Sequence, residues 1–271
     1  MHLALKLFLP ALLTLLAQIL LAAQATAAAP DQCLALAQNT NSLVQSTSWK
    51  VAQLEPSEVR LSYIGHSTFL IESASGVKIA TDYNDYVRPA VVPDIATMNR
   101  AHNTHYTNFP DPAIAHVLRG WSDTGAALHD LTVSDVRVRN VPTNIRTWDG
   151  GTMPYGNSVF VFEIAGLCIA HLGHLHHTLT TQQLAQIGQM DVVLVPVDGS
   201  YTLDLDGMLE VLQALKAPLM IPMHYFSTFT LNRFLARVET SFDVVRNEVP
   251  TVVVSRTTLP TKPQVLVLPG G

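Results

Sequence analysis

The sequence predicts an α/β fold in which layers of β-sheet are covered by helices. Its first half contains short runs rich in Val and Ile, each bounded by Gly, Pro, Asn or Asp, as strands are. Its second half alternates such runs with segments whose apolar residues recur every three or four positions, as in amphipathic helices. Early strands followed by alternating strands and helices are typical of sheet layers that pack against helices.

The amino terminus has the layout of a secretory signal peptide. Lys6 precedes an apolar stretch over residues 7–22, and Ala25-Thr26-Ala27 offers a cleavage site of small residues. A membrane anchor is the alternative, but the apolar run is short for a span and Pro10 interrupts it. We therefore expect residues 1–27 to be removed and the mature protein to be periplasmic or secreted.

Composition limits the domains and partners. Residues 28–271 contain no linker, low-complexity tract or fixed-period repeat, so we expect one domain with no stable membrane span. Charged residues make up 14% of the chain, and the formal net charge is -5. Because this balance provides no basic surface for a polyanion, we expect no nucleic-acid partner.

The strand-like runs follow one another at short intervals. They cover residues 59–64, 68–72, 77–81, 95–99, 131–141, 157–164, 167–171, 192–197, 218–223, 252–255 and 264–268. Helices are expected after Thr180, a residue type that caps helix starts, and over residues 205–215 and 231–242.

Two cysteines remain after the signal. Cys33 follows it closely, and Cys168 lies inside the apolar run 166–170. An exported protein favours a disulfide between them, whereas the alternative is one buried and one exposed thiol. Neither cysteine has a partner at the spacing of metal ligands, so we assign neither to a metal.

Histidines gather where three of the strand-like runs end. They lie within residues 102–105, within residues 171–177 and at His224. Loops at strand ends allow a rigid scaffold to direct several imidazoles at one point, and imidazole is the commonest protein ligand of transition metals. The sequence therefore predicts a metal site built from distant segments.

Six segments follow one another from residue 59 onward: Gly65-His66-Ser67-Thr68-Phe69-Leu70-Ile71-Glu72, residues 80–83, 99–105, 170–177 and 195–202, and Ile221-Pro222-Met223-His224-Tyr225. In these segments and in their order the chain resembles the metallo-β-lactamase superfamily, and within it the ascorbate-phosphate-lactonase-like metal hydrolases, in an exported form. This resemblance implies a four-layer αββα sandwich with the metal site at one edge of the two sheets.

The family's signature motif, His-x-His-x-Asp-His, is degenerate here. It falls on Arg100, His102, Thr104 and His105, so two of its four ligand positions have changed. The mid-chain histidine that the family places near residues 141–146 is absent. Because an arginine cannot ligate a cation, we expect the first of the family's two metal positions to be empty.

By the same resemblance, the family's bridging aspartate falls on His174 and its last ligand on His224. Together with His105, these residues would form a site of three imidazoles with one open position, which is a catalytic zinc geometry. We therefore expect one divalent metal ion, with zinc as its identity.

Other residues near these segments have open roles. His102 is either a spare ligand or a donor to a substrate oxyanion, and His177 could approach the metal if a helical turn follows His174. His66 borders the site in the family and is either a ligand or a packed histidine. Asp82 matches an acid that orients a ligand, with a turn-forming role as the alternative. If the chain stays extended there, His171 and His176 are expected to point away from the direction of their neighbours.

The chemistry implied by the resemblance is hydrolysis by a metal-activated water of an ester, lactone or phosphodiester bond in a small-molecule substrate. Arg100 is expected to hold an anionic group of the substrate, and Asp198 or His102 to transfer the proton. For Asp198 a loop-capping role before Gly199 is the alternative. Because the motif is degenerate, the second function in view is a catalytically inactive metal-binding or ligand-binding protein of this fold.

Overall fold

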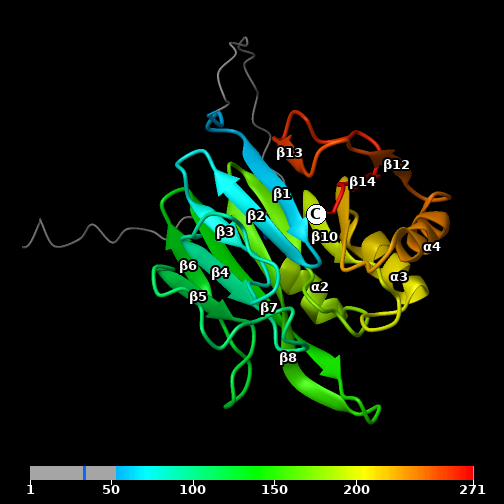
Figure 1. Ribbon diagram of the computed structural model, residues 1–271. Helices are drawn as coiled ribbons and strands as arrows, with labels where there is room; N and C mark the ends of the chain where they lie inside the picture. Colours follow the sequence, from blue (N-terminus) through cyan, green and yellow to red (C-terminus); the bar gives the residue numbers. More distant parts are fainter. Residues whose placement is uncertain (1–32, 35–52, 271) are drawn as a thin grey trace, which may run out of the picture. The chain divides into compact units, whose positions relative to one another are not determined.

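Two β-sheets form the centre of the molecule, as seen in Figure 1, a computed structural model that describes Cys33, Leu34 and residues 53–270. The predicted signal peptide lies outside the described residues. The first sheet has the order β13 (Thr251–Val254), β1 (Val59–Gly65), β2 (Thr68–Ser73), β3 (Lys78–Ala80), β4 (Ile95–Met98) and β5 (His116–Arg119). The second has the order β12 (Asp243–Arg246), β14 (Gln264–Val267), β11 (Leu219–Met223), β10 (Val192–Pro196), β9 (Leu167–His171), β8 (Thr152–Ile164), β7 (Val136–Arg146) and β6 (Asp130–Val133).

The main core lies between the two sheets. Strand β1 alternates buried and half-buried residues along its length, so one face can pack inward while the other meets the surroundings. Leu61 and Ile71 of the first sheet share this core with Phe160, Ile169 and Ile221 of the second. Burying the apolar faces of both sheets is the main stabilisation of the sandwich.

The helices cover the other face of the second sheet. They are α2 (Thr181–Ile187), α3 (Leu205–Leu215) and α4 (Thr228–Val238). Val193 and Val195 of β10 pack with Met208 and Leu212 of α3 and with Phe234 of α4. Strand β10 is buried along its whole length, as expected for a central strand covered on both faces. Within residues 53–270 no helix has the length and apolar character needed to cross a membrane.

The expected α/β sandwich is confirmed, and its layers differ in how they are covered. On the outer face of the first sheet, Ala80, Ala96 and Met98 pack against Tyr83 and Ile114, which come from connecting segments. No helix of the described residues lies in these segments. They contain four prolines, which shorten regular structure because proline lacks a backbone donor.

The structure differs from the sequence prediction in four elements. The single strand expected over residues 131–141 is a hairpin, β6 and β7, whose turn includes Ser134 with a φ of 52°. Strands β5 and β12 were not expected, because each is short and half exposed and lacks a continuous apolar run. Helix α4 begins earlier than expected, because the Ser227 side chain accepts a hydrogen bond from the backbone of Thr230.

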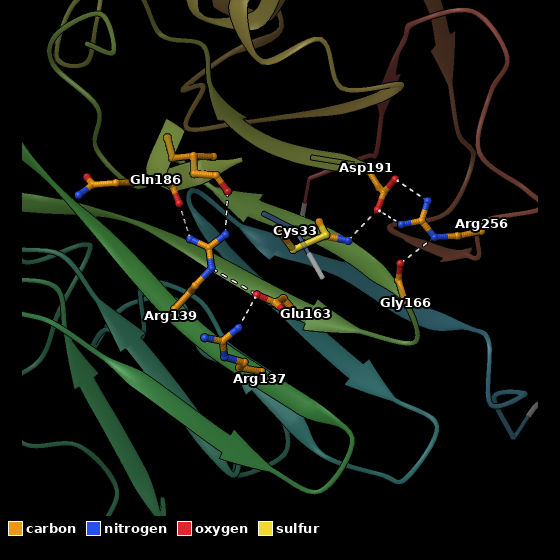
Figure 2. Close-up of a disulfide and its surroundings, with 10 residues drawn as sticks. Cys33, Arg137, Arg139, Glu163, Gly166, Gln186, Asp191 and Arg256 are labelled. Atoms are coloured by element: carbon orange, nitrogen blue, oxygen red, sulfur yellow. Dashed lines mark hydrogen bonds and ion pairs between the residues drawn. A yellow bond between two sulfur atoms is a disulfide. The ribbon is translucent and has the colours of Figure 1, made fainter. Parts of the chain in front are cut away.

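A disulfide joins Cys33 to Cys168 on β9, with 5.9 Å between the two Cα atoms (Figure 2). Of the two alternatives for the cysteines, a disulfide or two free thiols, the structure has the disulfide. Nearby, Arg139 of β7 pairs with Glu163 of β8 and donates to the carbonyls of Gln186 and Ile187 at the end of α2. An arginine that satisfies the last carbonyls of a helix stabilises that helix end. This end of the sheet is therefore held by covalent, ionic and hydrogen bonds together.

Candidate metal centre

The histidine segments meet where strand ends of both sheets come together. Strands β9, β10 and β11 are parallel neighbours, so their carboxyl ends point to the same edge. In such sheets ligands bind just beyond the carboxyl ends of the strands. The loops that follow strands of the two sheets at this edge supply six titratable residues: His66, Asp82, His105, His174, Asp198 and His224.

His105 is held by a buried carboxylate. Its Nδ1 lies 2.5 Å from Oδ2 of Asp82 and 3.1 Å from the hydroxyl of Ser67. The other Asp82 oxygen accepts a hydrogen bond from the side chain of Asn99. Burial raises the pKa of Asp82 to about 6, so the group is mainly a carboxylate at pH 7 and accepts the proton of His105 Nδ1. The Nε2 of His105 is then unprotonated.

His224 is held in a similar way from the other sheet. Its Nδ1 lies 3.1 Å from Oδ1 of Asp198, close but without good hydrogen-bond alignment. Burial would raise the pKa of Asp198, but the adjacent His224 ring and a hydrogen bond from Thr202 outweigh this effect and lower it. Asp198 also accepts bonds from the backbones of Ser200 and Tyr201. A carboxylate that stays ionised favours the tautomer of His224 with its proton on Nδ1.

The two Nε2 atoms of His105 and His224 face each other at 3.2 Å. In the tautomers set by Asp82 and Asp198, both atoms carry lone pairs, and two facing lone pairs repel each other. Two nitrogens that each lie 2.0–2.1 Å from a tetrahedral zinc ion would be about 3.3 Å apart. The observed separation therefore fits two ligands of one cation.

His66 is the third member of the group. One ring nitrogen from each of His66, His105 and His224 lies within 4.8 Å of the others. The Nε2 of His66 is 3.1 Å from the hydroxyl of Thr104, the residue at the aspartate position of the family motif. The carbonyl of His66 accepts the backbone N–H of His224 at 2.6 Å, which joins the two sheets at the site.

Three residues of the site have left-handed backbones. His66, Asp82 and His224 have φ values of 51°, 42° and 55°. Such a conformation is uncommon for residues other than glycine and costs of the order of 1 kcal/mol or more each. Residues held in this way tend to cluster at functional sites, so the backbone geometry supports the same location independently of the side chains.

His174 lies beside this group without belonging to it. Its ring centre is 4.7 Å from that of His105 and 4.8 Å from that of His224, in edge-on contacts. Its Nδ1 is 2.5 Å from Nε2 of His176, and its buried Nε2 has no hydrogen-bond partner. The expected trio with His105 and His224 therefore clusters, but the nitrogens that approach most closely include His66 in place of His174.

The prediction that His176 points away from its neighbours is wrong. It contacts His174, and its Nδ1 accepts the backbone N–H of Arg146 at 2.7 Å. A signal in the sequence could have found this contact, because residues two apart in an extended segment share one face. The contact with Arg146 had no such signal, since that residue lies on the distant strand β7.

The other residues predicted to take part in the site lie at different distances from the cluster. His102 is exposed, and its ring centre is 4.8 Å from that of His174. His177 has a buried Nε2 without a hydrogen-bond partner, and its ring centre is 6.5 Å from that of His176. The Arg100 guanidinium is 3.5 Å from the exposed carboxylate of Asp123, and within residues 53–270 no hydrogen bond joins it to the histidines.

The environment keeps the imidazoles of His66, His105 and His174 neutral. Burial, followed by the nearby His224, lowers the pKa of His66 to about 3 and places that of His105 well below its usual range. Burial and the neighbouring histidines lower the pKa of His174 in the same direction. Because metal ions bind the neutral form of imidazole, the lowered pKa values of His66 and His105 suit these two rings to bind a cation at neutral pH.

A cavity of about 470 Å³ adjoins the cluster at His66. Tyr63, Tyr225 and Phe226 contribute to its lining, and Arg246 provides a positive charge. The exposed rings of Phe226 and Tyr201 lie 5.6 Å apart, centre to centre, and Phe226 also contacts His66 and His224. The approach to the histidines is therefore partly aromatic.

Comparisons with known proteins agree with the fold. A family model described as "Beta-lactamase superfamily domain" matches residues 60–224, which include the cluster from His66 to His224. A crystal structure of a candidate zinc-dependent hydrolase of the metallo-β-lactamase superfamily from Thermotoga maritima is 31% identical. It covers 79% of this chain and 100% of its own chain, with a TM-score of 0.57.

Curated relatives extend this agreement. A UPF0173 metal-dependent hydrolase of Nanoarchaeum equitans is 24% identical over 184 residues, which cover 62% of this chain and 84% of the relative. One of Methanosphaerula palustris is 24% identical over 232 residues, which cover 79% and 98% of the two proteins. This chain belongs to the metallo-β-lactamase superfamily, as a relative of its metal-dependent hydrolases.

Proposed function

We propose that this protein is an exported hydrolase that uses one divalent metal ion, zinc, to cleave an ester, lactone or phosphodiester bond of a small-molecule substrate. Export is supported by the signal-like amino terminus and by the disulfide between Cys33 and Cys168, a bond typical of oxidising compartments. The named relatives support the use of a metal ion in hydrolysis.

The observation that carries the proposal is the pair of facing nitrogens. The Nε2 atoms of His105 and His224 lie 3.2 Å apart, while each ring presents its Nδ1 to a buried carboxylate. A metal-ligating histidine usually gives its other N–H to a carboxylate, a carbonyl or water. Both histidines therefore have the partner expected of a ligand, and His66 is the third ligand in the proposal.

The bound ion supplies an activated water and polarises the scissile oxygen. Asp82 and Asp198 fix the orientation of His105 and His224. Since Asp198 is engaged by several donors and its pKa is lowered, we assign it to positioning His224 rather than to proton transfer. His102, which is exposed beside the cluster, is the better placed of the two expected residues to exchange protons with solvent.

The substrate proposed is small and carries an anionic group. The cavity beside His66 has the size of small-molecule pockets and is lined by aromatic residues. Arg246 lines the cavity, whereas Arg100 is paired with Asp123. We therefore propose that Arg246, in place of Arg100, binds the anionic group of the substrate. Replacement of Arg246 by Gln should raise the KM for an anionic ester more than the KM for its neutral analogue.

The decisive experiment measures metal and turnover on the same preparations. Mature protein purified without added metal should contain about one equivalent of zinc by elemental analysis. It should hydrolyse chromogenic esters, lactones or phosphodiesters, and removal of the ion with a chelator should abolish turnover until zinc is restored. His105→Ala and His224→Ala should lose both metal and turnover. His116→Ala, on β5 outside the cluster, is the matched control and should keep both.

Two results would contradict the proposal. About two equivalents of metal in wild-type protein would show that the first metal position of the family is also occupied. One equivalent with no turnover on any probe would favour the alternative, a catalytically inactive metal-binding or ligand-binding protein. Urea unfolding of each alanine variant separates a lost ligand from a lost fold, because a folded variant retains a cooperative transition.

A further inference from the structure

His174 occupies the position of the family's bridging aspartate, but its surroundings differ from those of a ligand. Its ring nitrogens are outside the set of His66, His105 and His224 that lie within 4.8 Å of one another. Its neighbour is another imidazole, His176, rather than a carboxylate. The proton positions in this pair follow from a contact with the backbone.

The backbone N–H of Arg146 determines the tautomer of His176. This N–H lies 2.7 Å from Nδ1 of His176 and can only donate, so Nδ1 must be the acceptor. A neutral imidazole has one N–H, which places the proton of His176 on Nε2. A doubly protonated His176 would point a second N–H at the Arg146 amide and is therefore disfavoured.

The tautomer of His176 determines that of His174 in turn. Nε2 of His176 lies 2.5 Å from Nδ1 of His174, so the Nε2 proton of His176 is donated to that nitrogen. His174 must accept on Nδ1, and its own proton is then on Nε2. The chain of hydrogen bonds therefore runs from the Arg146 backbone through His176 to His174. It leaves an N–H on the Nε2 side of the His174 ring.

This last N–H is buried and has no hydrogen-bond partner in the described part of the chain. With Nδ1 facing His176, the remaining ring neighbours of His174 are His102, His105 and His224. A nitrogen that carries a proton cannot ligate a metal ion, since ligation uses its lone pair. A buried donor without a partner lowers the stability of the folded state, and a catalytic role is one explanation for such a group.

We propose that His174 is a catalytic residue that donates a hydrogen bond from Nε2 to the substrate oxygen on which negative charge develops, and that it is not a metal ligand. The inference rests on the proposed hydrolytic function. A neutral donor held in place before the reaction stabilises developing charge without reorganisation. In this role His176 is a positioning residue, because it acts only by holding the tautomer of His174.

Metal affinity distinguishes the donor from a ligand. In competition with a zinc chelator, His174→Ala should keep its zinc affinity within about tenfold of wild type, while His224→Ala should lose more than about 100-fold. The kcat of His174→Ala for a chromogenic ester should fall by about 10²–10³-fold, as for removal of one oxyanion donor. His174→Gln, which can place an N–H near the same point, should recover part of the kcat. Zinc affinity lost equally in His174→Ala and His224→Ala would overturn the proposal.

Proton positions can be measured without turnover. Long-range proton–nitrogen correlation spectra of protein labelled with ¹⁵N-histidine should show His174 and His176 as Nε2–H tautomers, with and without zinc. His176→Ala should remove the constraint on His174 and change its nitrogen shifts. A protonated Nδ1 on His174 would overturn the inference even in an active enzyme. A wild-type protein with the expected tautomers but no bound metal would instead reject the hydrolase and, with it, the catalytic role.

Discussion

The two ends of the second sheet differ in how many of their buried polar groups have hydrogen-bond partners. At the end that holds Cys168, the carboxylate of Glu163 pairs with Arg137 and Arg139, and Asp191 accepts from the backbone of Cys168 and from Arg256 (Figure 2). At the other end, buried nitrogens of His171, His174 and His177 have no hydrogen-bond partner in the described residues.

Strand β9 links these ends, since Cys168 lies near its start and His171 at its close. The satisfied end contributes stability, because paired groups recover the cost of leaving water. At the histidine end, several buried nitrogens have no partner and three residues have left-handed backbones. These features do not stabilise the fold. The difference indicates that stability and function are concentrated at separate ends of one sheet, and this separation can be tested.

Removal of the disulfide should have the largest effect on stability. The bond closes a sequence separation of 135 residues, so replacing Cys33 and Cys168 together by Ala should lower the free energy of unfolding by about 2–5 kcal/mol. Urea titration measures this loss, and reduced wild-type protein should show a similar one. Zinc affinity should not change. A large loss of zinc affinity in the folded double variant would mean that the two ends are coupled.

Glu163→Gln should also destabilise the protein without affecting the metal site. The change removes the carboxylate that pairs with Arg137 and the buried Arg139, and hydrogen bonds to charged groups contribute about 1.5–3 kcal/mol each. Glu72→Gln is the matched control, because Glu72 pairs with Arg60 at a more exposed position and should cost less than about 1 kcal/mol. Equal losses in the two variants would contradict the role given to burial.

Asp198→Asn should produce the reverse pattern at the histidine end. The amide presents a weaker acceptor to Nδ1 of His224, so zinc affinity should fall about 10–100-fold, as for other partners of metal-ligating histidines. Asp82→Asn should act in the same way through His105. Calorimetric titration with zinc measures both. Unchanged zinc affinity in both variants would remove the carboxylates from the proposed site.

Acid should weaken the metal-free protein through its histidines. Burial lowers the pKa of His66 to about 3 and that of His176 to about 4, whereas unfolded histidine titrates near 6.5. As the pH falls below about 6.5, the unfolded state binds protons that the folded state does not, so the free energy of unfolding decreases. Asp82 opposes this between pH about 6 and 3.8, because its pKa is raised by burial.

The net effect should follow the histidines, since they outnumber the acids whose pKa is raised by burial, Asp82 and Asp191. We expect a decrease of about 1 kcal/mol per pH unit or more, because the buried His105 and His174, whose pKa values are also lowered, add to the effect of His66 and His176. Urea titrations of chelator-treated protein at pH 7.5 and pH 5.0 measure it. Stability that stays level or rises on acidification would contradict the assignment of these imidazoles as neutral.

Several features could be predicted from the sequence because they depend on local patterns. The period-two and period-four apolar patterns located most strands and helices, and histidines next to strand ends indicated the site. His105, Asp82 and His224, which the sequence singled out, contact one another in the structure. Short, half-exposed strands such as β5 and β12 escaped prediction, because their patterns do not differ from those of loops.

The sequence by itself determined the order of the strands that bring chemistry to one edge and the residue types found there. Only the tertiary structure decided which atoms meet: His66 beside His105 and His224, and Asp198 on Nδ1 of His224. In the proposed arrangement it also decides which ring nitrogen of His174 carries the proton, because the backbone N–H of Arg146, thirty positions before His176, donates to His176. The physical reason is that apolar periodicity is a property of neighbouring residues, whereas ring orientation and tautomer depend on hydrogen bonds between segments that only folding brings together.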